Sequence, residues 1–263
     1  MTDKKPGDLI PRILSALVLA PIVLGTVFFG GVAFQIMLGS VIVLAAFEWA
    51  RLTCGPRWYG DMAIIAGTAL AVLLVPDLTG WIIPAGMVAS GALCWIRGQE
   101  YRWRLLGVPY IALGPMAMFW LRELDGVGFT LIVWLLLVVW SMDIGAYFAG
   151  RAIGGPKLAP RISPNKTWAG LVGGMASAAL AGGAVASVAF LGPVWMLAVL
   201  AALVGAWSQV GDIAESMVKR LFGVKDMSNI IPGHGGVLDR IDGLLFAAPA
   251  LAAGVLLLRA IGS

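Results

Sequence analysis

The chain has 263 residues, of which 60% are hydrophobic and 12% are charged, and its formal net charge is +4. A mean hydropathy of +0.93 leaves too little polar surface for a soluble globule of this length, which excludes the ordinary soluble classes. The 18 lysines and arginines are scattered between apolar runs and form no dense patch, so the basic balance does not indicate nucleic-acid binding.

Long apolar runs follow one another along the whole chain. A helix needs about 20 apolar residues to cross a bilayer, and scanning on that basis gives about nine runs. They lie at 12–29, 31–50, 61–75, 81–96, 106–121, 129–149, 168–190, 194–213 and 240–260. The first run looks like a signal peptide but has no small-x-small cleavage site, so we expect it to be retained as a transmembrane span. The predicted fold is an all-α, polytopic integral membrane protein with about nine transmembrane helices.

Short links and the placement of basic residues give the predicted topology. Phe29-Gly-Gly31 divides the first two runs, and Pro76 to Gly80 divides the third and fourth, so these neighbours are expected to be antiparallel. With the N-terminus in the cytoplasm, sixteen of the 18 lysines and arginines fall on the cytoplasmic side, and only Arg122 and Arg259 fall outside. This split is what the positive-inside rule expects.

Charged groups gather in the C-terminal half, in the stretches 141–151, 163–170 and 211–242. All three lie near the cytoplasmic face in the predicted topology, so they could form one site. Asp143 lies within an apolar run, where an unpaired charge costs roughly 2.5 kcal/mol or more, and it needs a partner. A pairing with a lysine or arginine on another helix is the structural alternative to a functional role.

Acids recur at helical spacing in the third stretch. Asp212 ends the eighth run, and Glu215, Ser216 and Lys219 would follow it on one face of a continuing helix. Asp239 and Asp242 share a face at the start of the ninth run. Singly, such acids are caps or surface ion pairs. Together they repel one another unless a cation lies among them, and oxygen ligands of this kind select Mg²⁺, Mn²⁺ or Ca²⁺.

Basic residues and two loops extend this polar set. Lys219, Arg220, Lys225 and Arg240 alternate with the acids, as in sites where metal ions and cations share the charge of a polyphosphate. Ser163 to Thr167 precedes the seventh run and can cap its helix, while Lys166 can hold an anion. His234-Gly235-Gly236 is a loop whose backbone can approach a ligand closely. Neither loop has P-loop spacing.

The run SMVKRLFGVKDMSNIIPGHGGVLDRID, residues 216–242, resembles the signature of the CDP-diacylglycerol synthases, also called phosphatidate cytidylyltransferases. Its Ser-x-x-Lys-Arg, Lys-Asp, Pro-x-His-Gly-Gly and Asp-Arg-x-Asp elements all match. SPNKTWAG at 163–170 and the segment around Asp143 are also similar to the family, so the resemblance covers about residues 140–245.

The resemblance implies an enzyme that joins CTP to phosphatidate and gives CDP-diacylglycerol and pyrophosphate. It also implies a homodimer, which we expect in the bacterial inner membrane. The predicted topology places the N-terminus and the active site on the cytoplasmic side. The family's metal-binding aspartates match Asp212 and Asp239, with Asp143 and Asp242 as support. We expect Mg²⁺ as the cofactor, with a second, monovalent cation as an option, and no nucleic-acid partner.

The remaining assignments complete the predicted site. The expected catalytic residues are Lys219, Arg220, Lys225, Asp226, His234 and Arg240, and the expected substrate-binding residues are Ser163, Asn165, Lys166, Thr167, Ser216, Gly235 and Gly236. Residues 1–130 are expected to form a scaffold with dimer contacts, and residues 131–263 the catalytic part.

Two other functions stay open at this point. A CTP-dependent polyprenol kinase would use the same charge chemistry, and only the signature opposes it. An ion-coupled transporter would also place acids within its spans, but it needs polar groups near the membrane midplane. Glu48, Asp143 and Gln209 are the main candidates for such depth.

Overall fold

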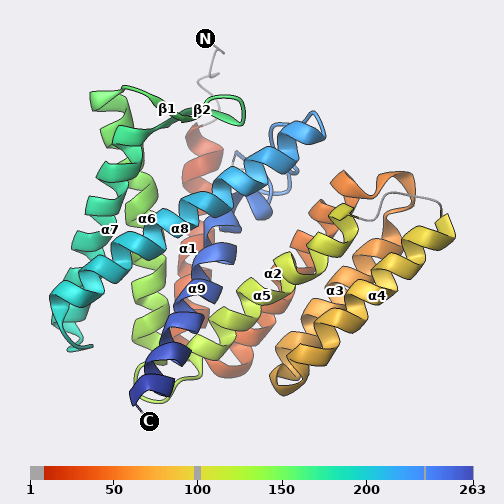
Figure 1. The fold of residues 1–263 in the computed structure, drawn as a ribbon, viewed down its shortest axis with the longest axis horizontal. Coiled ribbons are helices and arrows are strands. Elements are labelled where there is room, and N and C mark those ends of the chain that lie inside the picture. Colours follow the sequence, from red (N-terminus) through yellow and green to blue (C-terminus); the bar gives the residue numbers. More distant parts are fainter. Residues whose placement is uncertain (1–8, 98–101, 234, 263) are drawn as a thin grey trace. The chain divides into compact units, whose positions relative to one another are not determined.

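A computed structural model describes residues 9–97, 102–233 and 235–262, and it is helical over most of them (Figure 1). The chain forms two compact units. One comprises residues 1–119 and 224–241, and the other comprises residues 120–223 and 242–263. The division of function between residues 1–130 and 131–263 follows different boundaries and stays a prediction.

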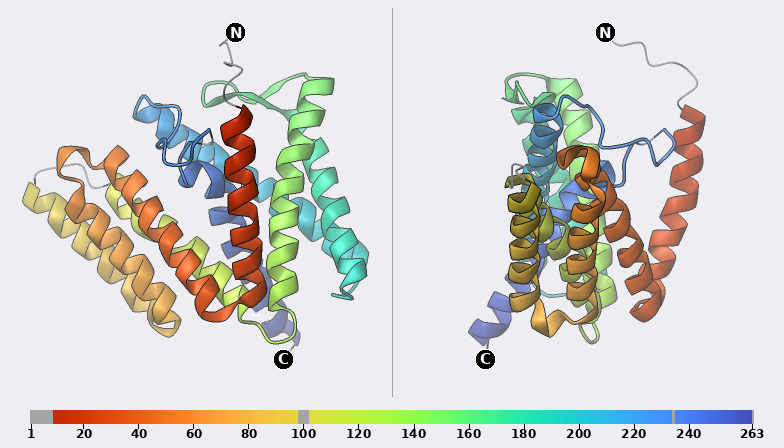
Figure 2. Two further views of the ribbon diagram at one scale, coloured as in Figure 1. Left: turned by 180° about the vertical axis from the view of Figure 1, so that it is seen from behind. Right: turned by 90° about the vertical axis from the view of Figure 1, so that its right-hand side faces the viewer.

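The first unit contains four helices and most of a fifth. These are α1 (Leu9–Phe29), α2 (Gly31–Thr53), α3 (Tyr59–Leu74), α4 (Thr79–Arg97) and α5 (Arg102–Arg122). Gly30 ends α1 with φ of 63°, which makes the predicted turn before α2, and a short 3-10 helix, Pro76–Leu78, links α3 to α4. The unit also contains a loop at 224–237, which reaches α1 through a hydrogen bond from Ser15 Oγ to Pro232 O (Figure 2).

A fully buried carboxylate ties three helices of this unit together. Asp61 on α3 pairs with Arg97 Nη1 of α4 at 3.0 Å and with Arg104 Nε of α5 at 3.4 Å. Arg104 also donates a hydrogen bond to the carbonyl of Cys54, at 2.7 Å. Because an unpaired buried charge is costly, these contacts fix the spacing of α3, α4 and α5.

The second unit contains α6 (Gly128–Ile153), strands β1 (Lys157–Ala159) and β2 (Ser163–Thr167), α7 (Trp168–Val188), α8 (Val194–Leu221) and most of α9 (Leu238–Gly262). Glycines let α6 and α7 pack closely. A Cβ at Gly170 would lie 2.9 Å from Ala146 O, and one at Gly174 would lie 2.7 Å from Met142 O. Small residues at these positions therefore let the two helix backbones approach closely.

The antiparallel pair β1–β2 was not predicted from sequence, which indicated only a loop before α7. The strands have three and five residues, and Pro164 lies inside the second one. Segments this short carry no alternating pattern, and proline is tolerated because a two-stranded sheet has only edge strands.

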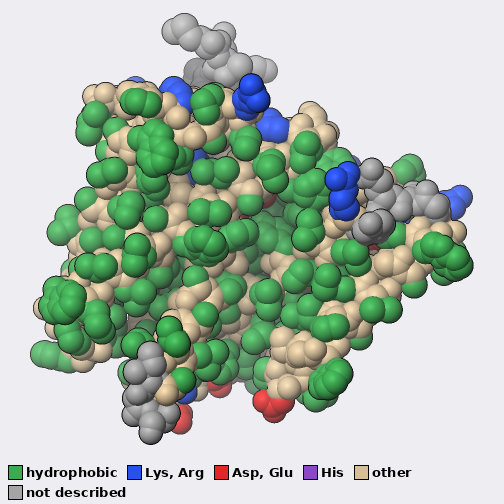
Figure 3. Space-filling view, in the orientation of Figure 1, with side chains coloured by type: hydrophobic (Ala, Val, Ile, Leu, Met, Phe, Trp, Pro, Cys, Tyr) green, Lys and Arg blue, Asp and Glu red, His purple; other side chains and the backbone are tan. Residues whose placement is uncertain are grey.

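The helices agree with the predicted membrane fold. Nine α-helices lie in the described residues, and seven of them are long and apolar enough to cross a membrane. The segment Leu17–Phe29 of α1 and the whole of α3 are shorter apolar helices. Hydrophobic side chains cover much of the surface seen in Figure 3. Among the exposed ones are Trp95 on α4, which is 86% exposed, and Phe190 after α7, which is 92% exposed. An apolar outer surface of this extent is what lipid contact requires.

Two neighbouring glycines of α7 offer a test of this packing. A methyl group at Gly182 would overlap Ala201 Cβ of α8 and lie 3.0 Å from Trp134 Nε1, whereas one at Gly183 would lie 3.4 Å from Ala198 Cβ, an ordinary contact. Gly182→Ala should therefore lower stability by about 1–3 kcal/mol through overpacking. Gly183→Ala should leave stability unchanged or raise it by up to about 1 kcal/mol, because alanine favours helix.

Thermal unfolding of both variants in detergent is the measurement. Equal melting temperatures for the two would show that α7 and α8 are not packed as described.

Candidate functional site

Each unit contains one group of polar side chains that includes residues of the predicted site. In the second unit they surround α8, and we call this set the α8 cluster: Asp143, Lys166, Gln209, Asp212, Glu215, Ser216, Lys219 and Asp242. In the first unit they belong to the segment 224–237, which we call the signature loop, together with Glu48 on α2 and Asp239 on α9. Each group is described separately.

A chain of hydrogen bonds joins three elements in the α8 cluster. Gln209 Nε2 donates to Asp143 Oδ1 of α6 at 2.7 Å, and Gln209 Oε1 accepts from Lys166 Nζ of β2 at 2.9 Å. Lys166 Nζ also pairs with Asp212 Oδ2 at 2.6 Å. Asp143 therefore has a partner, as predicted, and one such partner is the neutral amide of Gln209. The same amide also binds Lys166, so it links the carboxylate to a lysine.

The predicted stripe along α8 is formed, because the helix continues to Leu221. Ser216 Oγ donates to Asp212 Oδ1 at 3.3 Å, and Lys219 Nζ pairs with Glu215 Oε2 at 2.9 Å. Asp242, in the second turn of α9, lies close enough to Asp212 and Glu215 for electrostatic interaction. Three carboxyl groups thus lie near two ammonium groups, an arrangement suited to binding cations and phosphates together.

The hairpin before α7 positions Lys166. Thr167 is the N-cap of α7, and its hydroxyl accepts a hydrogen bond from Gly170 N at 3.0 Å, so the predicted capping is present. Ser163 and Asn165 lie on β2, and Arg220 Nε of α8 donates to the carbonyl of Ile162 beside that strand at 3.4 Å. A role in substrate binding stays a prediction for all of these residues.

Asp239 organises the signature loop in the first unit. Its Oδ2 accepts hydrogen bonds from Met227 N at 2.9 Å and from Gly236 N at 2.8 Å. Gly235 has φ of 83°, and a Cβ there would lie 3.1 Å from Asp239 Oδ2. Two distant parts of the loop are thereby held together, with one oxygen of Asp239 fixed by the backbone.

Glu48 of α2 holds the same loop from the other side. It is 1% exposed, and its carboxylate accepts hydrogen bonds from Ser228 Oγ at 2.5 Å, Val237 N at 2.9 Å and Leu238 N at 2.8 Å. A Cβ at Gly236 would lie 2.6 Å from Glu48 Oε1. The paired glycines of the signature therefore leave space for two carboxylates of the protein itself.

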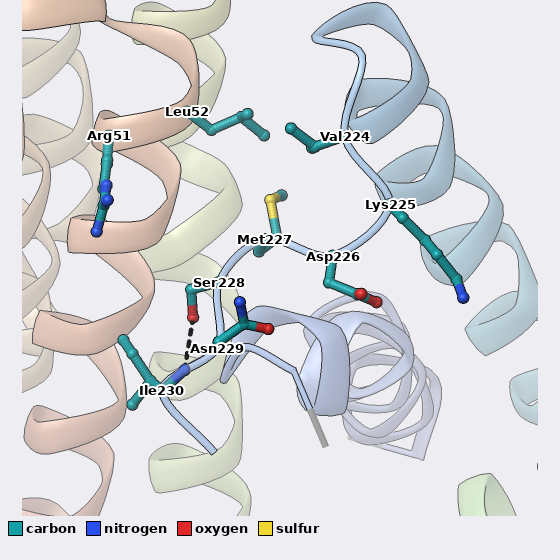
Figure 4. Close-up of a pocket in the computed structure, with 9 residues that line it drawn as sticks. All are labelled: Arg51, Leu52, Val224, Lys225, Asp226, Met227, Ser228, Asn229 and Ile230. Atoms are coloured by element: carbon teal, nitrogen blue, oxygen red, sulfur yellow. Dashed lines mark hydrogen bonds between the residues drawn. The ribbon is translucent and has the colours of Figure 1, made fainter. Parts of the chain in front are cut away.

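A pocket of about 640 Å³ lies between α2 and the signature loop. Arg51 of α2 lies on one side and Lys225 on the other, while Asp226, Ser228 and Asn229 supply further polar groups (Figure 4). The structure thus brings Lys225 and Asp226, predicted as catalytic, to a charged hollow. Arg240 follows Asp239 on α9 and is exposed, and His234 lies outside the described residues.

The carboxylates suit Mg²⁺ only when water and substrate phosphates supply the rest of its ligands. Among the described residues, no group of three or more His, Cys, Asp or Glu side chains is arranged to hold an ion alone. Mg²⁺ commonly binds through one or two carboxylates and takes water and substrate phosphates as its other ligands. Asp212, whose side chain is 33% exposed, and the nearby Asp242 suit that form in the second unit. The assignments of Asp143 and Asp239 as ligands stay predictions.

Sequence reasoning did not assign Glu48 or Gln209 to the site, although the structure joins each to residues of the predicted set. Both were noted only as polar residues within apolar runs, which is the signal that could have found them. Their partners lie far along the chain, 180 residues away for Ser228 and 66 for Asp143, so no local pattern connects them.

Comparison with known proteins identifies the family. Residues 10–258 match the model of the "Cytidylyltransferase family". The chain is 42% identical to the phosphatidate cytidylyltransferase of Brucella suis over 93% of its own length and 92% of that protein. It is 41% identical to the phosphatidate cytidylyltransferase of Pseudomonas aeruginosa, with 92% and 95% covered, and 32% identical to that of Bacillus subtilis, with 93% and 96% covered. The chain therefore belongs to the cytidylyltransferase family.

Proposed function

We infer that the chain transfers CMP from CTP to phosphatidate and releases pyrophosphate. The observation that carries this inference is the 42% identity to a phosphatidate cytidylyltransferase across 92% of that protein's length. The signature at 216–242 lies within residues 10–258, which match the family model. The apolar helices suit an enzyme whose lipid substrate and product stay in the membrane. A polyprenol kinase or a transporter is not favoured, because the relatives carry the name of the cytidylyltransferase.

The reaction needs little acid–base chemistry from the protein. The second pKa of a phosphate monoester is about 6, so phosphatidate is largely ionised at neutral pH. One of its oxygens attacks the α-phosphorus of CTP, the bond from that phosphorus to the oxygen bridging to the β-phosphate breaks, and pyrophosphate leaves. The work of the protein is to position two anions and to neutralise the charge of the leaving group.

The α8 cluster suits that work. Lys166 and Lys219 each pair with a carboxylate, so their ammonium groups are held in place beside Asp212 and Glu215. Arg220 at the end of α8 adds an exposed guanidinium. Mg²⁺, when bound at Asp212 and Asp242, would supply further positive charge to the nucleotide phosphates. A second, monovalent cation is an option that the same oxygens would accommodate.

Topology and assembly follow the sequence-based expectations as proposals. We place the N-terminus and the α8 cluster on the cytoplasmic side of the bacterial inner membrane, where CTP is available, and we expect a homodimer. Labelling of single cysteines from each side of the membrane, and the mass of the protein in nanodiscs, measure these two properties.

An assay of the purified protein in detergent tests the function. The protein is incubated with Mg²⁺, CTP labelled in the α-phosphate and phosphatidate, with polyprenol replacing phosphatidate in a parallel sample. We expect label in the organic phase with phosphatidate only, and none after addition of EDTA. Transfer from γ-labelled CTP to polyprenol would instead make the protein a lipid kinase.

Asp239→Asn removes the negative charge of Asp239 but keeps an oxygen that can accept hydrogen bonds from the loop. The asparagine oxygen can still accept from Met227 N and Gly236 N, so the variant should stay folded. Loss of the negative charge should abolish activity, with unchanged thermal unfolding in detergent. Full activity at ordinary Mg²⁺ would refute the assignment of Asp239 as a metal ligand.

Gln209→Leu tests the chain of contacts in the α8 cluster. Leucine cannot connect Asp143 with Lys166, so we expect turnover to fall by about tenfold or more, because Lys166 loses its orientation. Ser208→Ala is the matched control, since the neighbouring Ser208 is buried on α8 and its hydroxyl donates to Gly205 O of the same helix. Equal rates for the two variants would mean that Gln209 does not support the reaction.

A further inference from the structure

Glu48 is a buried carboxylate in the apolar helix α2. The helix is apolar around it, and a charge at such a position is tolerated only when its partners compensate for the lost water. All three partners that the structure shows come from one distant segment, at Ser228, Val237 and Leu238. The carboxylate therefore serves to hold that segment.

The contacts with Val237 and Leu238 fix the start of α9. Leu238 is the first residue of that helix, and the backbone N–H groups at a helix start have no partner within the helix. Glu48 supplies that partner from another helix, and its negative charge also suits the positive end of the helix dipole. Asp239 is the next residue, so the position of its side chain depends on this anchor.

The contact with Ser228 fixes a second part of the loop. Ser228 Oγ lies 2.5 Å from Glu48 Oε1 and also accepts a hydrogen bond from Ile230 N at 3.2 Å. Ser228 and Ile230 both line the pocket that contains Arg51 and Lys225 (Figure 4). Glu48 thus connects the wall of this pocket with the start of α9 through a single rigid group.

We propose that Glu48 is a positioning residue for cytidylyl transfer, which holds the signature loop so that Asp239, Lys225 and Asp226 keep their working positions. The proposal rests on the proposed function. Glu48 touches no reacting atom; it acts through the backbone of residues 237–238 and through Ser228. Because a misplacement of about 1 Å can cost about 10²-fold in rate, its loss should lower kcat by that order.

Glu48→Gln is the sharpest variant, because glutamine has nearly the same volume and keeps one oxygen. The NH₂ group of the glutamine would face the backbone N–H of either Val237 or Leu238. Two hydrogen-bond donors would then point at each other, and one hydrogen bond would be lost. Gln35→Leu is the matched control, since Gln35 is also on α2 and its amide donates to Leu73 O at 3.2 Å, away from the loop. Ser228→Ala removes one donor and keeps the other two.

Two measurements are made on each variant of the full-length protein in detergent. The first is hydrogen–deuterium exchange without substrates, read in peptides covering 224–241. The second is the rate of CMP transfer, with kcat and KM for CTP determined separately. We expect Glu48→Gln to exchange faster in this segment and to lose about 10²-fold in kcat with a change in KM of less than about threefold. Ser228→Ala should show a smaller change in the same direction, and Gln35→Leu neither effect.

Two results would overturn the proposal. One is a kcat within about twofold of the wild type in Glu48→Gln, and the other is an equal loss in Gln35→Leu, which would indicate a general effect on helix packing. If Glu48→Gln fails to fold, an unchanged kcat in Ser228→Ala would overturn the proposal in its place. A wild-type protein that transfers no CMP would refute the proposed function, whereas the exchange data would still report on the contacts of Glu48.

Discussion

The structure depends on the cost of burying a carboxylate away from water. Glu48, Asp61 and Glu215 are each no more than 1% exposed, and each lies on a helix that is largely apolar. An unpaired charge in such surroundings would cost several kcal/mol, so every one of them must be matched by donors or cations from elsewhere in the chain. The matches decide which segments lie together.

The three matches differ in what they connect. Asp61 binds two arginines of neighbouring helices, which joins helices that are already close in sequence. Glu215 pairs with Lys219 one turn later on the same helix. Glu48 alone binds a loop, through Ser228 and the start of α9. Asp61 has a structural explanation, and Glu215 belongs to the α8 cluster. Glu48 connects an N-terminal helix with a segment of the family signature, which is why we assign it a positioning role in the reaction.

Much of the fold could be predicted because apolar runs and short links determine it. The predicted spans agree with the helices to within a few residues, except that α8 continues to Leu221, beyond the end of its run at residue 213. The spacing of Asp212, Glu215 and Lys219 indicated this continuation. The β hairpin at 157–167 was missed, because strands of three and five residues show no periodic pattern.

The sequence predicted which types of residue form the candidate site, but it predicted few of the contacts between them. Acids and bases within the stretches 211–242 and 163–170 indicated phosphate chemistry, and the structure places Lys166 on Asp212. The contribution of Gln209 required three-dimensional contacts, since an isolated amide in an apolar helix does not reveal its partner. The paired glycines were expected to approach a ligand. In the structure their neighbours include the carboxylates of Glu48 and Asp239. These contacts depend on the tertiary fold and could not be predicted from the sequence.

The central claim is that the protein joins a lipid phosphate to CMP and leaves the β- and γ-phosphates of CTP together. Phosphorus-31 NMR of the complete reaction measures this directly. We predict that one pyrophosphate appears for each lipid diphosphate formed, while the phosphatidate signal falls by the same amount. Release of CDP together with a diacylglycerol diphosphate that carries no CMP would contradict the account, because the γ-phosphate would then have been transferred to phosphatidate.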